Sequence, residues 1–180
     1  MGLFTNSIRP AGGLSSGYEG GIIQMKYTPV RGVISHSSNE TGAHTSAFDT
    51  TITPTSTSSR ILISVMFGCI SSTGGNTNGF MIRRGSTEID DLRGNAVGNR
   101  RRYTARGTTT WNADGNHAHN YAFTVLDHPN TTSAITYRLY TANEGSNTVY
   151  FNRNRNDSNS GNPIYGRTMS SMIVMEVTRG

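Results

Sequence analysis

The chain of 180 residues has one cysteine, one lysine and one tryptophan, and it has no long apolar run. A single cysteine excludes a disulfide framework within one chain. The lack of an apolar run of membrane-spanning length excludes a transmembrane helix, so we expect no membrane insertion. No stretch of eleven residues keeps the i, i+3, i+4, i+7 apolar spacing of an amphipathic helix. These absences favour strands over helices as the main secondary structure.

Hydrophobic residues make up only 33% of the chain, and Gly, Ser, Thr and Asn dominate the rest. This content is low for a monomer with a deep core. It suits a thin sandwich of two sheets, particularly one that buries further surface against copies of itself.

The positive charge comes almost entirely from arginine. The net charge is +5, the isoelectric point is near 9.7, and Lys26 is the one lysine beside fifteen arginines. Guanidinium groups suit bidentate contacts with carboxylates or phosphates. A basic face of this kind can contact nucleic acid, lipopolysaccharide phosphates or an acidic protein neighbour. We favour the simpler interpretation, in which the arginines form salt bridges in loops and between subunits.

Two features of the sequence, one internal and one at its start, bear on the cellular compartment. Cys69 lies inside the apolar run 60–70, which predicts a buried structural thiol and not a nucleophile. Residues 1–13 lack both the basic and the apolar part of a secretory signal. We therefore expect a soluble protein that is made without an export signal.

Residues 1–20 differ in composition from the remainder of the chain. They contain five glycines and scattered apolar residues with no period. Such a segment cannot cover its own backbone, so we expect an extended arm that orders against a partner. The residues expected to anchor it are Phe4, Ile8, Arg9 and Leu14. The domain boundaries predicted are an arm over 1–20 and a β-sandwich over 21–180.

Short runs of alternating apolar and polar residues fill the predicted domain, separated by Asn, Gly, Ser, Thr and Pro. Strands are predicted at 22–27, 32–36, 46–53, 60–70, 79–84, 101–105, 118–127, 134–142, 147–152 and 171–178. Eight to ten antiparallel strands in about 160 residues indicate an all-β jelly roll or a related sandwich. The loops expected to face solvent are 71–79, 85–100 and 107–117.

Catalytic patterns are scarce. Glu88, Asp90 and Asp91 could in principle flank a sugar bond, but neighbouring arginines make an ion-paired surface the preferred interpretation. The chain has no Gly-x-Ser-x-Gly elbow, and its Gly-rich segment 72–79 lacks the lysine of a phosphate-binding loop. We therefore expect no enzymatic activity and no cofactor.

One metal hypothesis remains open. His117 and His119 are two residues apart, so on an extended segment both imidazoles point to one side. Three such pairs around a threefold axis would supply six nitrogen ligands for an octahedral metal. The alternative is a pair of loop histidines with no ligand role.

The run 99–106 interleaves arginine with an aromatic residue, as nucleic-acid-binding patches do. On a strand, Arg100 and Arg102 would face one way, and Arg101 and Tyr103 the other. We do not expect nucleic acid as the ligand, because no groove-reading element accompanies the run. Arg101, Tyr103 and Trp111 are instead candidates for binding a glycan, with Trp111 stacking on a sugar ring.

The order of several segments resembles a family of small bacteriophage virion proteins, common among marine and cyanobacterial phages. The resemblance rests on 52–70, a Thr/Ser turn followed by an apolar strand, and on the later segments 126–132, 135–138, 148–153 and 172–177. It covers roughly residues 22–178. It implies a tail-fibre or other virion surface protein with a trimeric jelly roll of the tumour-necrosis-factor type.

Together the resemblance and the pattern of strands predict a non-enzymatic structural protein of a phage particle. We expect a homotrimeric surface projection, fibre-like or capsid-decorating, that is assembled in the host cytoplasm and docked on other virion proteins through its arm. The three loops named above would then face solvent or a host. The aromatic residues that are candidates for the trimer interface are Tyr121, Phe123, Tyr137, Tyr140, Tyr150 and Phe151. About half of them are expected to lie in the core of the subunit instead. The alternatives are a module that binds a host polysaccharide and, third, a polysaccharide hydrolase.

Overall fold

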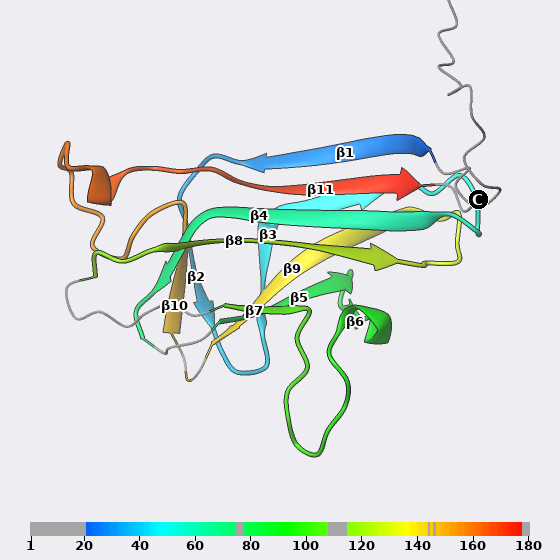
Figure 1. The fold of residues 1–180 in the computed structure, drawn as a ribbon, viewed down its shortest axis with the longest axis horizontal. Helices are drawn as coiled ribbons and strands as arrows, with labels where there is room; N and C mark the ends of the chain where they lie inside the picture. Colours follow the sequence, from blue (N-terminus) through cyan, green and yellow to red (C-terminus); the bar gives the residue numbers. More distant parts are fainter. Residues whose placement is uncertain (1–20, 75–77, 108–114, 144, 146, 178–180) are drawn as a thin grey trace, which may run out of the picture.

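The computed structural model describes residues 21–74, 78–107, 115–143, 145 and 147–177. In these ranges the chain forms eleven strands and two short 3-10 helices (Figure 1). The strands are β1 (Ile22–Val30), β2 (Ile34–Ser38), β3 (Ala43–Ile52), β4 (Arg60–Ser72), β5 (Asn78–Arg84), β6 (Thr87–Glu88), β7 (Ala105–Gly107), β8 (His119–Asp127), β9 (Ile135–Asn143), β10 (Asn147–Phe151) and β11 (Ser170–Val177). The helices are η1 (Asp90–Leu92) and η2 (Pro163–Tyr165).

The strands form two antiparallel sheets. One has the order β1-β11-β4-β10-β2, with β8 paired to β4, and the other has the order β3-β9-β5-β6, with β7 paired to β5. Figure 1 shows β1, β11, β4 and β8 lying side by side along the length of the molecule. The chain is therefore an all-β antiparallel sandwich, consistent with a jelly roll, as the alternating pattern predicts.

Alternation along β4 shows why these residues form strands that pack in layers. Ile61, Ile63, Val65 and Phe67 are fully buried, whereas Met66, between two of them, is 43% exposed. Successive side chains of a strand point to opposite faces, so one face of β4 enters the core and the other faces away from it. β-branched residues favour this extended backbone.

Phenylalanines from both sheets meet in the centre of the core. Phe67 of β4 lies 4.8 Å from Phe80 of β5 and 5.3 Å from Phe151 of β10, measured between ring centroids. Phe48 of β3 makes an edge contact with Phe67 at 5.7 Å. Cys69 of β4 is also buried, and burial raises the pKa of its thiol. The predicted structural thiol is thus confirmed as buried.

Two buried carboxylates tie loops to the ends of the sheets. Glu176 of β11 is fully buried and accepts hydrogen bonds from Ser59 Oγ (2.6 Å), from Gln24 and from the backbone and hydroxyl of Thr55. Burial by itself disfavours the charged form of Glu176, but these hydrogen bonds outweigh it and lower its pKa to about 2. The carboxylate therefore holds the 53–59 turn against β11.

Asp127, at the end of β8, is the second buried carboxylate. Both of its oxygens accept from the Arg84 guanidinium, at 2.8 and 2.6 Å, and one also accepts from Tyr137 Oη at 2.6 Å. Burial first, and the neighbouring carboxylate second, raise the pKa of Tyr137. Asp127 therefore joins β8 of one sheet to β5 and β9 of the other.

Each predicted strand except one overlaps an observed strand over most of its length. The exception is 101–105: residues 101–104 form no strand, and β7 begins at Ala105. The alternation assumed for that run was therefore wrong. No helix in the described part of the chain is long and apolar enough to cross a membrane. The predicted arm, 1–20, lies outside the described residues.

Candidate functional site

The segment between β5 and β7 folds back onto the sandwich through two apolar side chains. Ile89 immediately precedes η1, and Leu92 is its last residue. They are 7% and 4% exposed and belong to the core. The rest of the predicted loop 85–100 is largely exposed from residue 94 onward, as expected of a surface loop. A buried base and an exposed tip let this loop present side chains in fixed positions.

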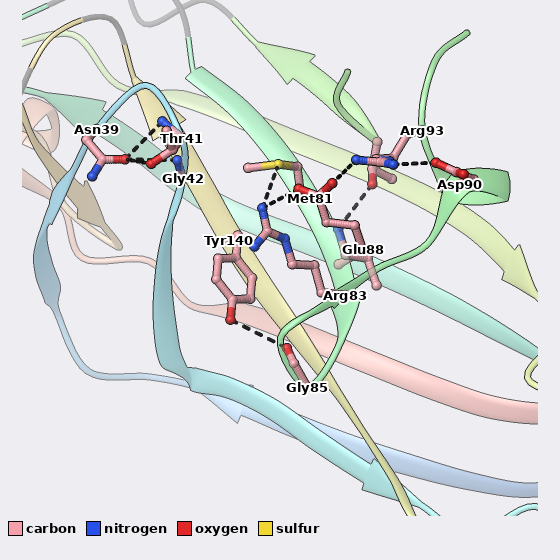
Figure 2. A network of polar contacts seen from close by, with 12 residues as sticks. Asn39, Thr41, Gly42, Met81, Arg83, Gly85, Glu88, Asp90, Arg93 and Tyr140 are labelled. Atoms are coloured by element: carbon pink, nitrogen blue, oxygen red, sulfur yellow. Dashed lines mark hydrogen bonds and ion pairs between the residues drawn. The ribbon is translucent and has the colours of Figure 1, made fainter. Parts of the chain in front are cut away.

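A network of ion pairs orders the base of this loop (Figure 2). Glu88 accepts from Arg83 at 2.7 Å and from Arg93. Asp90 accepts from Arg93 and, at 2.8 Å, from Arg102. The hydrogen bonds from Arg93 and Arg102 lower the pKa of Asp90.

This network bears on the hydrolase alternative. Glycoside hydrolysis needs one carboxylic acid that is protonated at the working pH, which requires a raised pKa. Asp90 has a lowered pKa, and Glu88 is held by two guanidinium groups. Glu88 and Asp90 therefore belong to an ion-paired surface, the arrangement favoured from the sequence.

Arg83 links the network to the neighbouring strand. Its guanidinium carbon lies 4.1 Å from the centre of the Tyr140 ring, and it also contacts Met81 Sδ at 3.7 Å (Figure 2). A guanidinium over an aromatic face is attracted by the ring's negative potential. The loop base is thereby held against β9.

Beside this network lies a cavity of about 610 Å³. Its lining comes from five places in the fold: the 39–42 turn, the loop before β7, β7 itself, the start of β5 and the end of β9. The lining residues are Glu40, Gly79, Arg100, Arg101, Tyr103, Arg106, Ala142 and Asn143. Cavities of this size accommodate small ligands.

Tyr103 is placed by a glycine. A Cβ at Gly79 of β5 would overlap the Tyr103 ring, so the ring lies directly against the β5 backbone. The main chain on either side is fixed, because Thr104 N donates to Phe80 O at 2.8 Å and Gly94 N donates to Tyr103 O at 3.1 Å. The ring is therefore a supported wall of the cavity.

The turn that carries Glu40 is also rigid. Asn39 Oδ1 accepts from Thr41 N (3.0 Å), Thr41 Oγ1 (2.8 Å) and Gly42 N (3.0 Å), the pattern of an Asx turn (Figure 2). Gly42 has a φ of 95°, which glycine adopts without steric cost. Glu40 forms an exposed ion pair with Arg101 at 3.1 Å.

The arginines of the 99–106 run are distributed differently from the prediction. Arg100, Arg101 and Tyr103 all line the cavity, although Arg100 was expected on the opposite face from the other two. Arg102 turns away, to Asp90 and to Gly94 O. The irregular backbone at 101–104 is the reason, because two-residue alternation holds only in an extended strand. The sequence therefore identified Arg101 and Tyr103 as neighbours but missed Arg100 and Arg106 as partners.

The other sequence-predicted site residues are not gathered there. His117 is exposed, and His119, on β8, stacks on Tyr121 with ring centres 6.2 Å apart. No group of three or more His, Cys, Asp or Glu suited to a metal occurs within the residues that the structure describes. A site shared by three chains stays a prediction. Trp111 and the four anchoring residues of the arm lie outside the described residues.

The six aromatic residues predicted at a trimer interface fall into three groups. Tyr137 and Phe151 are fully buried inside the chain, so their side chains offer no surface to a neighbour. Tyr121 and Phe123 are partly buried against the core. Tyr140 and Tyr150 are half-buried beneath Arg83 and Arg153, at 4.1 and 4.0 Å.

A group of exposed apolar residues lies elsewhere, on the outer face of the sheet β1-β11-β4-β8. The pairing registers align Met25, Met175, Leu62 and Leu126 in one row, and Tyr27, Ile173, Ser64 and Thr124 in the next. Met66 and Ala122 continue the face on β4 and β8. We call these ten positions the apolar sheet face. Met25 is 57% exposed, and Tyr27, Met66 and Leu126 are between 42% and 48% exposed.

Comparisons with known proteins give structural likenesses but no family. No family model matches the chain, and no curated protein matches it. A chain in a solved structure of the Gx strain of infectious bursal disease virus aligns over 94% of this chain, with a TM-score of 0.39 and 13% identity. This chain spans 44% of the length of that one. A likeness at this level assigns neither a family nor an activity.

Proposed function

We propose that this chain is a non-enzymatic structural protein of a bacteriophage particle, a homotrimeric surface projection that docks on the virion through residues 1–20. The observation that carries this proposal is the apolar sheet face. The resemblance of the strand order to small phage virion proteins supports the particle, the trimer and the docking arm.

The composition of the face supports contact with other protein. None of its ten positions carries a charge, although the whole chain has 27 charged residues. Lys26 and Glu176, on the same strands, occupy alternate positions and so point to the other side. An uncharged apolar patch is typical of the centre of a protein interface, where charged residues are depleted.

The occupant that fits the face is another copy of the same chain. Aliphatic, methionine and tyrosine side chains on a sheet face are complementary to surfaces of the same chemistry, and closed homo-oligomers bury such surfaces. The face also lies between β1 and β8, which have no second strand partner among the described residues. Association of copies would cover these edges as well. Three copies is the number that the family resemblance supports.

A substitution on the face tests the assembly. We expect Leu126→Glu or Met25→Glu to convert the trimer to monomer, because each would place an unpaired carboxylate in an apolar interface. Ile164→Glu is the matched control, since Ile164 is 46% exposed in η2, outside the face. Light scattering coupled to gel filtration measures the mass. A wild-type monomer or dimer, or equal effects of all three variants, would contradict the proposal.

The second candidate function is recognition of a host polysaccharide by the same projection. The cavity beside the 94–104 loop favours it, because it combines an aromatic wall with arginines and one carboxylate. Adsorption of phage particles to host cells, with and without added soluble protein, tests this candidate. We expect soluble wild-type protein to compete with the particle for its host.

A further inference from the structure

We propose that the cavity lined by Arg100, Arg101, Tyr103 and Glu40 binds an acidic saccharide, that is, a sugar carrying a carboxylate or a sulfate. The residues that line the cavity determine this ligand chemistry without reference to the proposed function. Only the identification of the ligand's source as a host surface rests on the proposed function.

The charge balance of the cavity calls for an anion. Three arginines and one glutamate line it, so it carries an excess of positive charge. Arg101 is paired with Glu40, but the side chain of Arg100 has no hydrogen bond or ion pair with any described residue. A guanidinium presents a planar fork of donors that matches the two oxygens of a carboxylate or of a sulfate. Arg100 is therefore the group positioned to bind the acidic substituent.

Tyr103 supplies the apolar surface that a sugar ring needs. Its ring is backed by the β5 backbone at Gly79 and is part of the cavity wall. Because the ring is held on one side, stacking a pyranose on it costs little side-chain entropy. Free carboxylate or sulfate ions would use the arginines but not this wall.

Glu40 favours a saccharide over a nucleic acid as the ligand of the cavity. An exposed carboxylate accepts hydrogen bonds from sugar hydroxyls, and it repels the closely spaced phosphates of a nucleic-acid backbone. Nucleic-acid grooves also need a track of cations along the strand. Here the cations gather around one cavity of about 610 Å³, which is a volume suited to one or two sugar units.

The test measures binding of glucuronic acid by calorimetry or by ligand-observed NMR, with glucuronic acid methyl ester as the neutral analogue of the same ring. Glucose 6-sulfate is the second acidic probe, and a dT10 oligonucleotide represents nucleic acid. We expect at least one acidic sugar to bind about tenfold or more tightly than the methyl ester. Which of the two acids binds better identifies the acidic group.

Two variants locate the site. We expect Arg100→Gln to weaken binding of the acidic sugar about tenfold and to leave the methyl ester unaffected. Arg31→Gln, which removes the same charge from an exposed position outside the cavity, should change neither. Tyr103→Leu should weaken binding of the acidic sugar, and Tyr103→Phe should preserve it, because Phe keeps the ring. Thermal melting confirms that each variant is folded.

Three results would overturn the inference: equal binding of glucuronic acid and its methyl ester, equal losses in Arg100→Gln and Arg31→Gln, or an oligonucleotide that binds more tightly than either acidic sugar. The oligomeric state of the same samples separates this inference from the proposed function. A trimer that binds no acidic sugar contradicts the saccharide site alone. A monomer that binds it contradicts the trimeric projection alone.

Discussion

At the scale of single residues, Glu176 is the clearest case of a side chain whose role depends on its surroundings. The sequence places it in an alternating strand, in a position that would normally be apolar. Hydrogen bonds from Ser59, Gln24 and Thr55 make the buried carboxylate tolerable there. All of these partners are more than 100 residues away from Glu176 in the chain. Local patterning therefore could not predict it.

Glu176 predicts how stability changes in acid. Its pKa is about 2 in the folded chain and near 4.5 in a model peptide, so the unfolded chain takes up the proton first as the pH falls. The stabilisation is present above about pH 4.5 and is lost between there and pH 2. We expect this loss to be about 3 kcal/mol. Urea unfolding at several pH values measures it.

The variant Glu176→Gln serves as the control for that experiment. It should be less stable than the wild type at neutral pH and should show a flatter dependence of the unfolding free energy on pH between 4.5 and 2. If the two proteins lose stability in parallel over this range, another carboxyl group is responsible.

At the scale of elements, the segment between β5 and β7 shows what alternation can and cannot predict. The loop 85–100 was predicted to face outward, and the structure agrees from residue 94 onward. The predicted strand 101–105 was wrong because the backbone at 101–104 is irregular. Arg101 and Tyr103 line the cavity, and Arg102 donates to Asp90.

The ion-pair network predicts local order in this segment. Arg93 bonds both Glu88 and Asp90, so Arg93→Gln should speed hydrogen exchange of backbone amides over 89–103 several-fold. Global stability should fall by less than about 1 kcal/mol, because exposed ion pairs contribute little. Hydrogen exchange followed by mass spectrometry resolves the segment.

Arg167→Gln provides the comparison for Arg93→Gln. Arg167 pairs with Asp157 in a different loop, so its loss should leave exchange over 89–103 unchanged. Faster exchange across β4 in either variant would show instead that the network supports the whole sandwich.

At the scale of the whole molecule, the arm and the sandwich are expected to act separately. The apolar sheet face belongs to β1, β4, β8 and β11, all within 21–180. We therefore expect a protein lacking residues 1–20 to remain trimeric and to keep its melting temperature within a few degrees, but to lose its place on the particle. Gel filtration with light scattering and immunolabelling of assembled particles measure the two outcomes. A monomeric truncation would show that the arm itself holds the trimer.

The sequence by itself determined the positions of most strands and the alternation within them, because the two faces of a strand follow from local backbone geometry. It also identified Arg101 and Tyr103 as a pair and Cys69 as a buried thiol. Only the tertiary structure decided which tyrosines enter the core, which sheet face stays uncovered and which arginines meet at one cavity. Those outcomes depend on strands paired across long stretches of chain, such as Met66 with Ser171, and a period of two carries no information about the partner.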